Sequence, residues 1–575
     1  MKKNERSQGI SRRSFLAGAG ILAASSGVFT AGCGPKKASE KSNASSATST
    51  TSEPSNTSDT SAVWQLKEVG EPDEVVQADV AIVGAGGTGT AAAIQAVDLG
   101  LKPIIVERLQ GYGGSFVGTE GMTALETKYT RDNPPYLSSA YYPDQPYGVK
   151  NAMNTCLNFH HWIPQHKLYE NFFGQTAETI DWLEGHGQKF ASVIGIGNGP
   201  KVWHVYDKGG EDSTPGGYFM QTFGKEAQNV GVETRFNTFA RKVVMEDGKV
   251  AGLLAETDKG KVLKIEAPVV LLGSGGYANN SDFLYAVSET KNENIQAMGM
   301  DCRDGDGIKM AKDAGADMAE SLGTVMWCGP VVVGAVTAAW TIDAYTAGVQ
   351  PTLWLNQDGE RFCKEDLWID DFAAAGIQVR NQKKTYVLFT EADVQRWEQS
   401  GPYGQCFSFG TPGTPLSQVR EQLQKASGCH VGDDLSTLCA EVGLDAAAVQ
   451  ATVDQYNSYC ATASSLDPDD VSADEEYGKR AQYLHAVDAG PYWLCEIADG
   501  YYTTCGGIKI NEKTQVLNED GEVIPGLYAG GSDAGGLYGD SYDVKFAPGS
   551  QAAWAVNSGR LAMKDAAAYL NKQKH

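Results

Sequence analysis

The sequence predicts an α/β fold with a doubly wound, Rossmann-like domain, and three observations support this prediction. Residues 80–83 are a short run of apolar, mostly β-branched side chains, typical of a buried parallel strand. Glycines follow at 84, 86 and 89, the spacing of a strand-to-helix turn that binds a dinucleotide. Roughly 500 residues follow a polar N-terminal segment, too many for one simple core, which favours two joined domains.

Each glycine of this turn has a separate expected role. Gly84 permits the tight turn, Gly86 lets the backbone approach a pyrophosphate, and Gly89 lets the helix pack close to the strand. Amide groups at the start of the helix point at the phosphates. The residues expected to bind the phosphates are Gly84, Gly86, Gly87 and Thr88.

An alanine-rich helix is predicted over 88–99 and a second strand over 102–106. This strand ends at Glu107, where a carboxylate typically accepts hydrogen bonds from the ribose hydroxyls of an adenine nucleotide. Because strand, turn, helix, strand and acidic residue follow in the required order, residues 79–107 predict a dinucleotide site rather than a glycine turn without a ligand.

The glycine-rich segment 108–122, RLQGYGGSFVGTEGM, distinguishes a flavin from a nicotinamide nucleotide. Its backbone can lie flat against a ligand. The segment resembles the loop found at this place in flavoproteins of the fumarate reductase and succinate dehydrogenase superfamily. It departs from that pattern at Glu120, where the family usually has a small residue. The resemblance implies non-covalent FAD, with contacts from Arg108, Gly113, Gly114, Ser115, Gly121 and Met122.

Further segments resemble the same superfamily in the same order along the chain. They include its strand and glycine turn, its G-D-G-I-x-M-A helix with Asp306 as the N-cap, its N-x-x-G-x-R-F turn, its capping-domain helix and its terminal strand. The matching segments are 267–279, 303–316, 356–362, 444–457, 476–479 and 521–531. Over about 79–560 the chain is similar to the soluble branch that includes flavocytochrome-type fumarate reductases, urocanate reductases and 3-ketosteroid dehydrogenases.

This resemblance implies a doubly wound, Rossmann-like FAD-binding domain with an inserted α+β capping domain. The FAD-binding domain is expected at 73–324 and 501–575, and the capping domain at 325–500. Strands are predicted over 236–257 and 261–272, with a hairpin turn at Asp247-Gly248. The last helix is expected to begin near Ser550, with its N-terminus at the pyrimidine end of the flavin. The remaining expected FAD contacts are Ala240, Gly275, Gly276, Asp306, Ser532, Gly549 and Ser550.

The N-terminus predicts export. SRRSFL at 11–16 is typical of a twin-arginine signal, so 1–32 is interpreted as a signal peptide. Its stretch of small and apolar residues, about 15–29, is too short and too glycine-rich to be a good membrane span. Cys33 resembles a lipoprotein cleavage site, and 33–72 is expected to be a disordered, Ser/Thr-rich linker. We therefore expect a lipid anchor at Cys33 on the outer side of the cytoplasmic membrane. Plain cleavage and release is the alternative.

Composition narrows the possible partners. The net charge of −24 is spread along the chain and argues against nucleic acid. The 11 cysteines form no C-x-x-C, so neither a c-type haem nor a cysteine-ligated cluster is visible, and no metal site or disulfide pair is predicted. The chain also shows no FMN-attachment domain. Electrons are therefore expected from a separate protein, a cytochrome or an FMN protein.

The residues that bind a dicarboxylate in fumarate reductases are missing. The catalytic arginine of the cap aligns near Ile369, and the cap histidine aligns near Trp327 and Cys328. A second histidine aligns with Thr503, and the last clamping arginine aligns near Tyr542. Without charge-assisted bidentate pairs, a small dianion would bind poorly. The sequence therefore argues against fumarate as the substrate.

Tyrosines replace these charged groups, and the catalytic candidates are Tyr542, Tyr538 and Tyr345. A phenol can polarise a carbonyl and donate a proton. Tyr542 resembles the tyrosine of an S-Y-P-G segment in ketosteroid dehydrogenases, although the proline is absent here. Packing is the preferred interpretation of Tyr538 and Tyr345, and also of His160 and His161.

Three functions remain open. The first is a respiratory reductase of an activated C=C bond in an aromatic enoate, enone or steroid-like molecule, which would be the organic electron acceptor. Hydride would move from flavin N5 to carbon. The second is a dehydrogenase of the ketosteroid Δ1 type. The third is a flavin- or ligand-binding lipoprotein without turnover. Export without a second redox centre favours the reductase.

Overall fold

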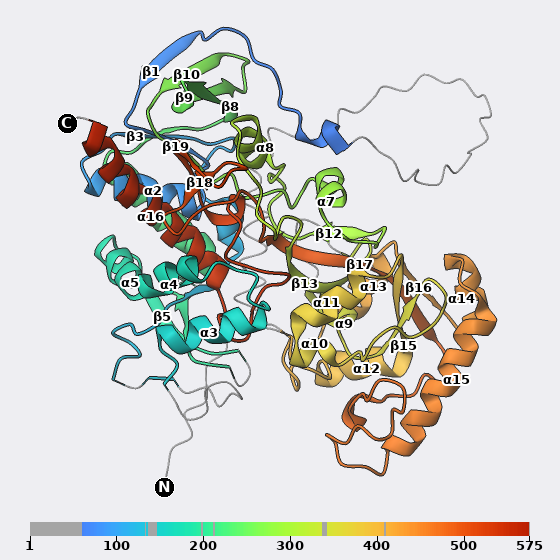
Figure 1. The fold of residues 1–575 in the computed structure, drawn as a ribbon. Helices are drawn as coiled ribbons and strands as arrows, with labels where there is room; N and C mark the ends of the chain where they lie inside the picture. Colours follow the sequence, from blue (N-terminus) through green and yellow to red (C-terminus); the bar gives the residue numbers. More distant parts are fainter. Residues whose placement is uncertain are drawn as a thin grey trace, which may run out of the picture.

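The computed structural model describes residues 60–132, 134–135, 146–196, 199–210, 213–335, 342–406 and 410–573. The predicted signal peptide and Cys33 lie outside these described residues. Figure 1 shows two groups of elements that a long strand, β17 (Tyr492–Thr504), connects. We call the part from β13 (Val325–Val332) to β17 the cap lobe, and the rest of the described chain the nucleotide lobe.

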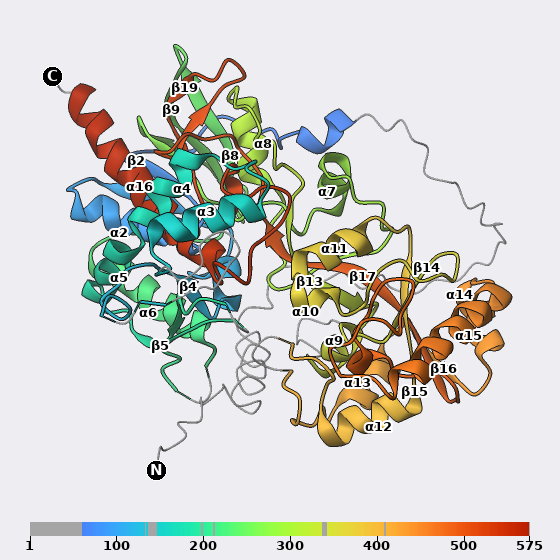
Figure 2. The same ribbon diagram turned by 60° about the horizontal axis from the view of Figure 1, so that its bottom comes forward.

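The central sheet of the nucleotide lobe has six strands in the order β18-β19-β11-β2-β3-β7. All neighbouring pairs are parallel except β18 with β19. Helices α2 (Gly87–Asp98) and α16 (Ser550–Gln573) pack on one face, and strands β8 (Thr238–Glu246) and β9 (Lys249–Thr257) of another sheet lie against the other (Figures 1 and 2). The parallel strands agree with the predicted Rossmann-like domain, but a second sheet takes the place of helices on one face. The strands are β2 (Val80–Val83), β3 (Pro103–Val106), β7 (Glu233–Arg235), β11 (Val270–Leu272), β18 (Gln515–Leu517) and β19 (Val523–Ala529).

The glycine turn after β2 has the geometry predicted from its spacing. Gly84 has a φ of +94°, and a Cβ there would lie 2.4 Å from the Gly273 carbonyl oxygen. A Cβ on Gly89 would lie 1.8 Å from the oxygen of Gly84, so only glycine allows α2 (Gly87–Asp98) to pack against the turn. The C-terminal helix α16 (Ser550–Gln573) packs along α2 in both ribbon views (Figures 1 and 2).

Two smaller sheets complete the nucleotide lobe, in the orders β1-β10-β9-β8 and β4-β6-β5. The predicted hairpin is confirmed, because Asp247 and Gly248 both have positive φ between β8 and β9. The single strand predicted over 261–272 is wrong: β10 and β11 belong to different sheets, and Pro268 between them cannot donate to a strand ladder. The bounds are β1 (Glu74–Gln77), β4 (Gly121–Thr123), β5 (Phe190–Ile194), β6 (Trp203–Tyr206), β8 (Thr238–Glu246), β9 (Lys249–Thr257) and β10 (Val262–Glu266).

The sheet of the cap lobe is built around β17, which pairs with β12, β13, β15 and β16. β17 continues across the boundary expected at 500/501, so one strand belongs to both lobes. Cys429 and Cys495 occupy paired positions of β16 and β17 and form a disulfide, a pair that the sequence did not identify. The other strands are β14 (Leu353–Asn356), β15 (Thr385–Thr390), β16 (Cys429–Gly432) and β12 (Ile295–Ala297), which the nucleotide lobe contributes to this sheet.

Helices lie around the sheets of both lobes (Figure 2). In the nucleotide lobe they are α3 (Val149–Phe159), α4 (His166–Gly174), α5 (Thr176–Gly185), α6 (Pro215–Asn229), α7 (Ser281–Val287) and α8 (Asp306–Asp313). In the cap lobe they are α9 (Ile342–Gly348), α10 (Leu367–Asp370), α11 (Phe372–Arg380), α12 (Glu391–Ser400), α13 (Val419–Lys425), α14 (Leu435–Val442) and α15 (Ala446–Ala463). Short 3₁₀ helices are η1 (Thr60–Trp64), η2 (Gly114–Gly118), η3 (Ala481–Tyr483) and η4 (Gly531–Asp533).

The motifs recognised in the cap lobe are structural. Arg361, from the NQDGERF segment, is buried and forms ion pairs with Glu365 at 2.8 Å and Asp474 at 2.9 Å. Lys479, from the EYGK segment at 476–479, is also buried and donates to the Thr352 carbonyl at 3.0 Å. These paired charges hold separate segments of the cap together.

Residues that precede the predicted linker boundary at residue 72 form secondary structure and pack on the nucleotide lobe. Residues 60–64 form η1, and the ring of Trp64 lies 4.8 Å from that of Phe283. Lys67 also forms an ion pair with Glu256 at 2.6 Å. The apolar residues near the end of the Ser/Thr-rich segment therefore pack on the nucleotide lobe. Among the described residues, no helix combines the length and apolar character that crossing a bilayer requires.

Candidate functional site

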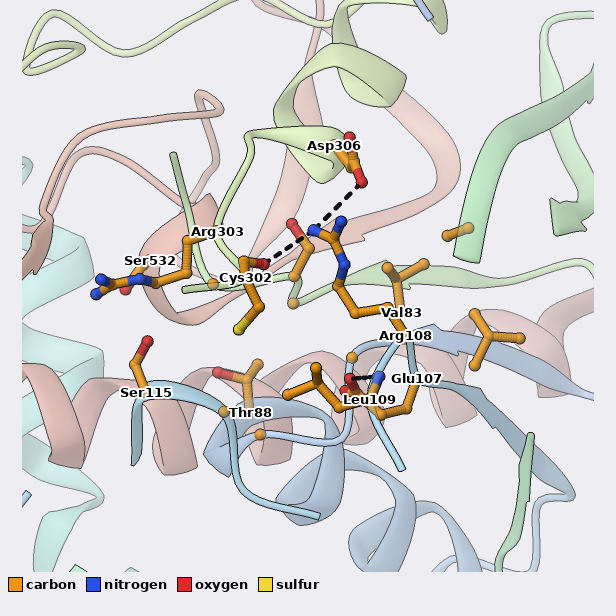
Figure 3. Close-up of a pocket in the computed structure, with 18 of the residues that line it drawn as sticks. Val83, Thr88, Glu107, Arg108, Leu109, Ser115, Cys302, Arg303, Asp306 and Ser532 are labelled. Carbon is orange, nitrogen blue, oxygen red and sulfur yellow. Dashed lines mark hydrogen bonds and ion pairs between the residues drawn. The ribbon is translucent and has the colours of Figure 1, made fainter. Parts of the chain in front are cut away.

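A cleft lies at the carboxyl ends of β2, β3 and β11, where ligands bind in doubly wound sheets. Figure 3 shows its lining, which comes from segments far apart in the sequence. Twelve of the residues expected at FAD line this cleft. They are Gly84, Gly86, Gly87, Thr88, Glu107, Arg108, Gly114, Ser115, Ala240, Gly275, Asp306 and Ser532.

Glu107 lies at the end of β3 and holds the glycine turn. Its carboxylate accepts hydrogen bonds from the amides of Ala85 and Leu109, both at 2.7 Å. Burial raises the pKa of Glu107, while these two hydrogen bonds lower it. The expectation that Glu107 serves only the ribose is therefore incomplete. Each carboxylate oxygen has a further lone pair, so the same group can also accept from a ribose hydroxyl in the cleft.

Arg108 connects two sides of the cleft. Its guanidinium donates to the Cys302 carbonyl at 3.0 Å and forms ion pairs with Asp304 at 2.8 Å and Asp306 at 3.8 Å (Figure 3). Burial lowers the pKa of Arg108, but the two carboxylates outweigh it and raise the pKa overall. The interpretation of Asp306 as an N-cap is wrong. Gly305, with a φ of +82°, is the N-cap, and Asp306 is the first helical residue, where its charge suits the helix dipole.

The second glycine turn, after β11, is held by Asp533. This buried carboxylate accepts from the amides of Ser274 at 2.5 Å and Gly276 at 2.8 Å. Burial raises the pKa of Asp533, and these hydrogen bonds oppose that rise. Gly276 therefore serves the turn rather than the cleft wall, whereas its neighbour Gly275 lines the cleft.

Five other expected contacts lie beside the cleft. Gly113 forms a β-bridge with Gly86 and so fixes the glycine loop against the first turn. Gly121 and Met122 belong to β4, and Gly549 and Ser550 begin α16. A Cβ on Gly549 would lie 2.6 Å from the oxygen of Gly121. The glycine loop and the start of α16 are therefore in direct contact.

The cleft fits FAD by two tests. A Cβ atom added to Gly86, Gly114 or Gly275 would have a single neighbouring atom, 3.6 Å away. The backbone at these three glycines therefore has free space beside it that a ligand can occupy. The hydroxyl oxygen of Ser115, which lines the cleft, is buried and has no hydrogen-bond partner among the described residues. Hydrogen-bonding groups of a flavin nucleotide would satisfy such an atom.

Sequence reasoning missed several residues of the cleft. Arg303 is 1% exposed and donates to Asn279 at 2.6 Å, to the Met298 carbonyl at 2.9 Å and to the Tyr502 carbonyl. Burial lowers the pKa of Arg303. Arg303 lies two residues before the Gly305-Asp306-Gly307 motif, which is the one sequence signal that marks it. The other missed lining residues include Leu109, Phe116, Thr238, Phe239, Gly273, Ser274, Cys302 and Asp304.

Two of the three candidate tyrosines meet at the first turn of α16. The Tyr542 hydroxyl accepts from the Gly549 amide at 3.1 Å, and the Tyr538 hydroxyl lies 2.9 Å from Ser550 Oγ. The two ring centroids are 5.5 Å apart. Burial raises the pKa of both phenols, so both keep their protons at neutral pH. They can therefore donate hydrogen bonds.

The third candidate, Tyr345, lies in the core of the cap lobe and not with the other two. Its hydroxyl donates to the Cys328 carbonyl, and it is also hydrogen-bonded to Tyr502. Tyr502 is therefore a tyrosine of this region that the sequence did not single out. Its neighbour Thr503, which aligns with a catalytic histidine, lies 3.1 Å from Ser532 Oγ.

The adjacent histidines point apart. His160 is buried among Phe159, Tyr169 and Tyr538, and burial lowers its pKa to about 4. His161 is exposed and lies 3.1 Å from Asp540. This arrangement agrees with packing rather than a metal pair.

Comparison with known proteins supports the site. Residues 79–543 match the FAD binding domain family. The vinyl phenol reductase of Lactiplantibacillus plantarum is 27% identical, with 86% of this chain and 97% of that protein covered. The fumarate reductase (cytochrome) of Shewanella frigidimarina is 25% identical, with 86% and 78% covered. The structure of 3-ketosteroid Δ1-dehydrogenase from Sterolibacterium denitrificans superposes with a TM-score of 0.65 at 18% identity, covering 86% of this chain and 99% of that one.

Proposed function

Because this chain belongs to the FAD binding domain family and is an FAD-dependent oxidoreductase, we propose that it reduces an activated C=C bond. The substrate would be an organic electron acceptor such as an aromatic enoate, an enone or a steroid-like molecule, and not fumarate. Vinyl phenol reductase, which matches almost end to end, is named for a substrate with a C=C bond.

The observation that supports this proposal best is the cluster of neutral hydroxyl groups near the start of α16. Tyr538 and Tyr542 lie there, and Thr503 takes the place of a charged group. Arg303 of the cleft wall and Arg380 of the cap lobe are already engaged. Arg303 donates to backbone carbonyls, and Arg380 pairs with the buried Asp499 at 3.1 Å. A dicarboxylate would therefore meet no free bidentate partner among these groups.

Bound FAD supplies hydride for transfer to a carbon of the acceptor. The chain must then place the acceptor and supply a proton. The positive end of the α16 dipole would favour negative charge that develops near the helix start. A protonated Tyr542 there can hydrogen-bond a substrate oxygen or donate the proton.

The physiological setting is also part of the proposal. A twin-arginine signal and Cys33 support export and lipid tethering, with no other membrane contact. A tethered reductase can collect electrons from a separate cytochrome or FMN protein and so end a respiratory chain. The alternatives are a dehydrogenase that works in the opposite direction and a flavin- or ligand-binding lipoprotein without turnover.

Two experiments test the proposal. Acid precipitation of the purified holoprotein should release all yellow colour as FAD; colour retained in the pellet, or FMN in the supernatant, would contradict non-covalent FAD. A reduced viologen dye should then be oxidised on addition of enones, aromatic enoates or vinyl arenes, and not of fumarate. Oxidation by fumarate alone would overturn the substrate class, and turnover only with saturated compounds and an oxidised dye would show the dehydrogenase.

A further inference from the structure

Four residues of the FAD cleft connect two segments that are far apart in the sequence, and we call them the Arg108 clasp. Arg108 follows the end of β3, whereas Cys302, Asp304 and Asp306 belong to the segment that leads into α8. All four line the cleft. The Arg108 guanidinium pairs with Asp304 at 2.8 Å and Asp306 at 3.8 Å, and it donates to the Cys302 carbonyl at 3.0 Å. Figure 3 shows the Arg108 side chain extending toward Cys302 and Asp306.

The clasp lies at the mouth of the cleft rather than at its base. The side chains of Arg108, Asp304 and Asp306 are 27%, 42% and 30% exposed. Val83 and Glu107 line the same cleft but are only 4% and 7% exposed. Solvent therefore reaches the clasp much more easily than it reaches the base of the cleft. A nucleotide bound against Glu107 would lie beneath the clasp.

An aromatic ring supports the guanidinium of the clasp. The ring of Phe239, which also lines the cleft, has its centroid 5.4 Å from the guanidinium carbon of Arg108. The guanidinium carbon of Arg241 lies 4.9 Å from the same centroid, and Arg241 pairs with Glu256 at 3.0 Å. Contacts of this kind between a cation and an aromatic ring are attractive. Residues from the end of β3, the start of α8 and β8 thus position one guanidinium.

The charges around Arg108 argue against direct binding of the FAD phosphates by this residue. The carboxylates of Asp304 and Asp306 raise the pKa of Arg108. The charge of Arg108 also acts on Glu107 and opposes the rise that burial causes in the pKa of that carboxyl. Three carboxylates therefore share one cation, and a pyrophosphate would gain little from it. The amides at the start of α2 are the groups that suit the phosphates.

We infer that the Arg108 clasp closes over bound FAD and controls the rate at which the cofactor leaves the protein. Its ion pairs must break before the segment at 302–306 can move away from the end of β3 and open the mouth of the cleft. Because these pairs are partly exposed, salt should weaken them: the screening length falls from about 10 Å at 0.1 M salt to about 3 Å at 1 M. The inference concerns the cofactor alone and does not depend on which substrate the enzyme reduces.

The rate of FAD release from the purified holoprotein tests this inference, and the measurement needs no electron acceptor. The holoprotein is diluted into excess phosphodiesterase, which converts free FAD to FMN, so the rise in flavin fluorescence reports release without rebinding. Arg108→Gln should release FAD roughly 5–30-fold faster than wild type, between the scale of an exposed ion pair and that of one charged hydrogen bond. Release from wild type should also become faster between about 0.1 M and about 1 M salt, and release from Arg108→Gln should change less.

Arg235→Gln is the matched control. Its guanidinium also pairs with two carboxylates, those of Glu74 at 3.2 Å and Glu233 at 2.7 Å, and it is 35% exposed, but it does not line the cleft. This variant should release FAD at the wild-type rate. A similar acceleration in Arg235→Gln and Arg108→Gln would overturn the inference, because it would show a general effect of losing an ion pair.

The acidic partner separates a clasp from a direct contact between Arg108 and the phosphates. Asp304→Asn keeps the size of the side chain and removes its charge. A clasp predicts faster release from this variant, whereas an Arg108 that binds phosphate would be freed by the change and would hold FAD longer. In the double variant Arg108→Gln/Asp304→Asn, release should be less than about 2-fold faster than in Arg108→Gln alone, because both changes break the same pair.

Slower release from Asp304→Asn would overturn the inference and assign Arg108 to the phosphates. Equal rates in wild type and Arg108→Gln would also overturn it, as would wild-type release that salt does not change. If Arg108→Gln does not yield a folded holoprotein, Asp304→Asn and the salt dependence of wild type decide the question.

Discussion

The carboxylate of Glu107 accepts a hydrogen bond from the amide of Ala85 at 2.7 Å, which ties the end of β3 to the glycine turn after β2. The same carboxylate accepts from Leu109. One acidic side chain therefore holds both the glycine turn after β2 and the segment that follows β3. An expectation based on the ribose alone would miss this structural role.

Glu107→Ala should weaken FAD retention much more than it weakens activity per bound flavin. The change leaves two amides without an acceptor and removes any bond to the ribose, at about 1.5–3 kcal/mol for each charged hydrogen bond. The measurement is the FAD remaining after dilution and ultrafiltration, with activity divided by bound FAD. Glu107→Gln, which keeps an acceptor oxygen, should lose less. A Glu107→Ala protein that retains full FAD on dilution would contradict the assignment.

Asp543 should make the protein less stable as the pH rises. It is 1% exposed, and burial raises its pKa from 3.8 to about 7, so the folded state keeps a proton that the unfolded chain releases. The stabilisation is full below about pH 4 and is lost as the pH rises through about 7. From this shift we expect a loss of roughly 2–4 kcal/mol in unfolding free energy between pH 4 and 8.

Asp543→Asn tests this dependence, because the amide stays neutral and can still accept from the amides of Lys545 and Phe546, at 3.1 and 2.8 Å in the wild type. Urea unfolding at pH 5 and pH 8 should show a smaller difference in the variant than in wild type. Because the other titratable groups are the same in both proteins, the difference between their pH dependences reports Asp543. Equal pH dependence in both proteins would show that Asp543 is ionised in the folded state.

Local patterns in the sequence were sufficient to predict the first βαβ unit, because Gly84 and Gly89 act through their own backbone and through the residues packed directly against them. Arg303 could not be predicted in the same way, since its partners Asn279, Met298 and Tyr502 come from separate segments. The disulfide depends on the register of two strands whose cysteines are 66 residues apart. Specific contacts in this chain thus follow from tertiary packing that no single motif encodes.

Cys33→Ala should move the protein from the membrane to the soluble exported fraction. The twin-arginine signal, the Gly32-Cys33 pair and the polar segment that follows motivate this expectation. A single diacylated cysteine supplies the only membrane contact that we propose. Fractionation of cells that express wild type or variant, followed by immunoblotting, measures the distribution. Wild type found in the soluble exported fraction would support simple cleavage instead.

Tyr542→Phe should slow the reaction with the organic acceptor while it leaves the flavin in place. The change keeps the ring and removes the hydroxyl that accepts from Gly549 at 3.1 Å. If that hydroxyl holds or protonates the substrate, reoxidation by the acceptor should slow by about 100-fold or more, the scale of a positioned general acid. Reduction of the bound FAD by a dye should be unchanged.

Tyr538→Phe is the matched control for this experiment, because its hydroxyl also contacts the first turn of α16, through Ser550. Both variants remove a hydrogen bond at the same helix start, so any loss of rate caused by disturbing that turn should be similar in the two proteins. Only Tyr542→Phe should lose the reaction with the acceptor. Stopped-flow reoxidation of the reduced protein by a confirmed substrate measures the difference. Equal rates in wild type and Tyr542→Phe would remove Tyr542 from the mechanism, and a loss confined to Tyr538→Phe would transfer the role to that residue.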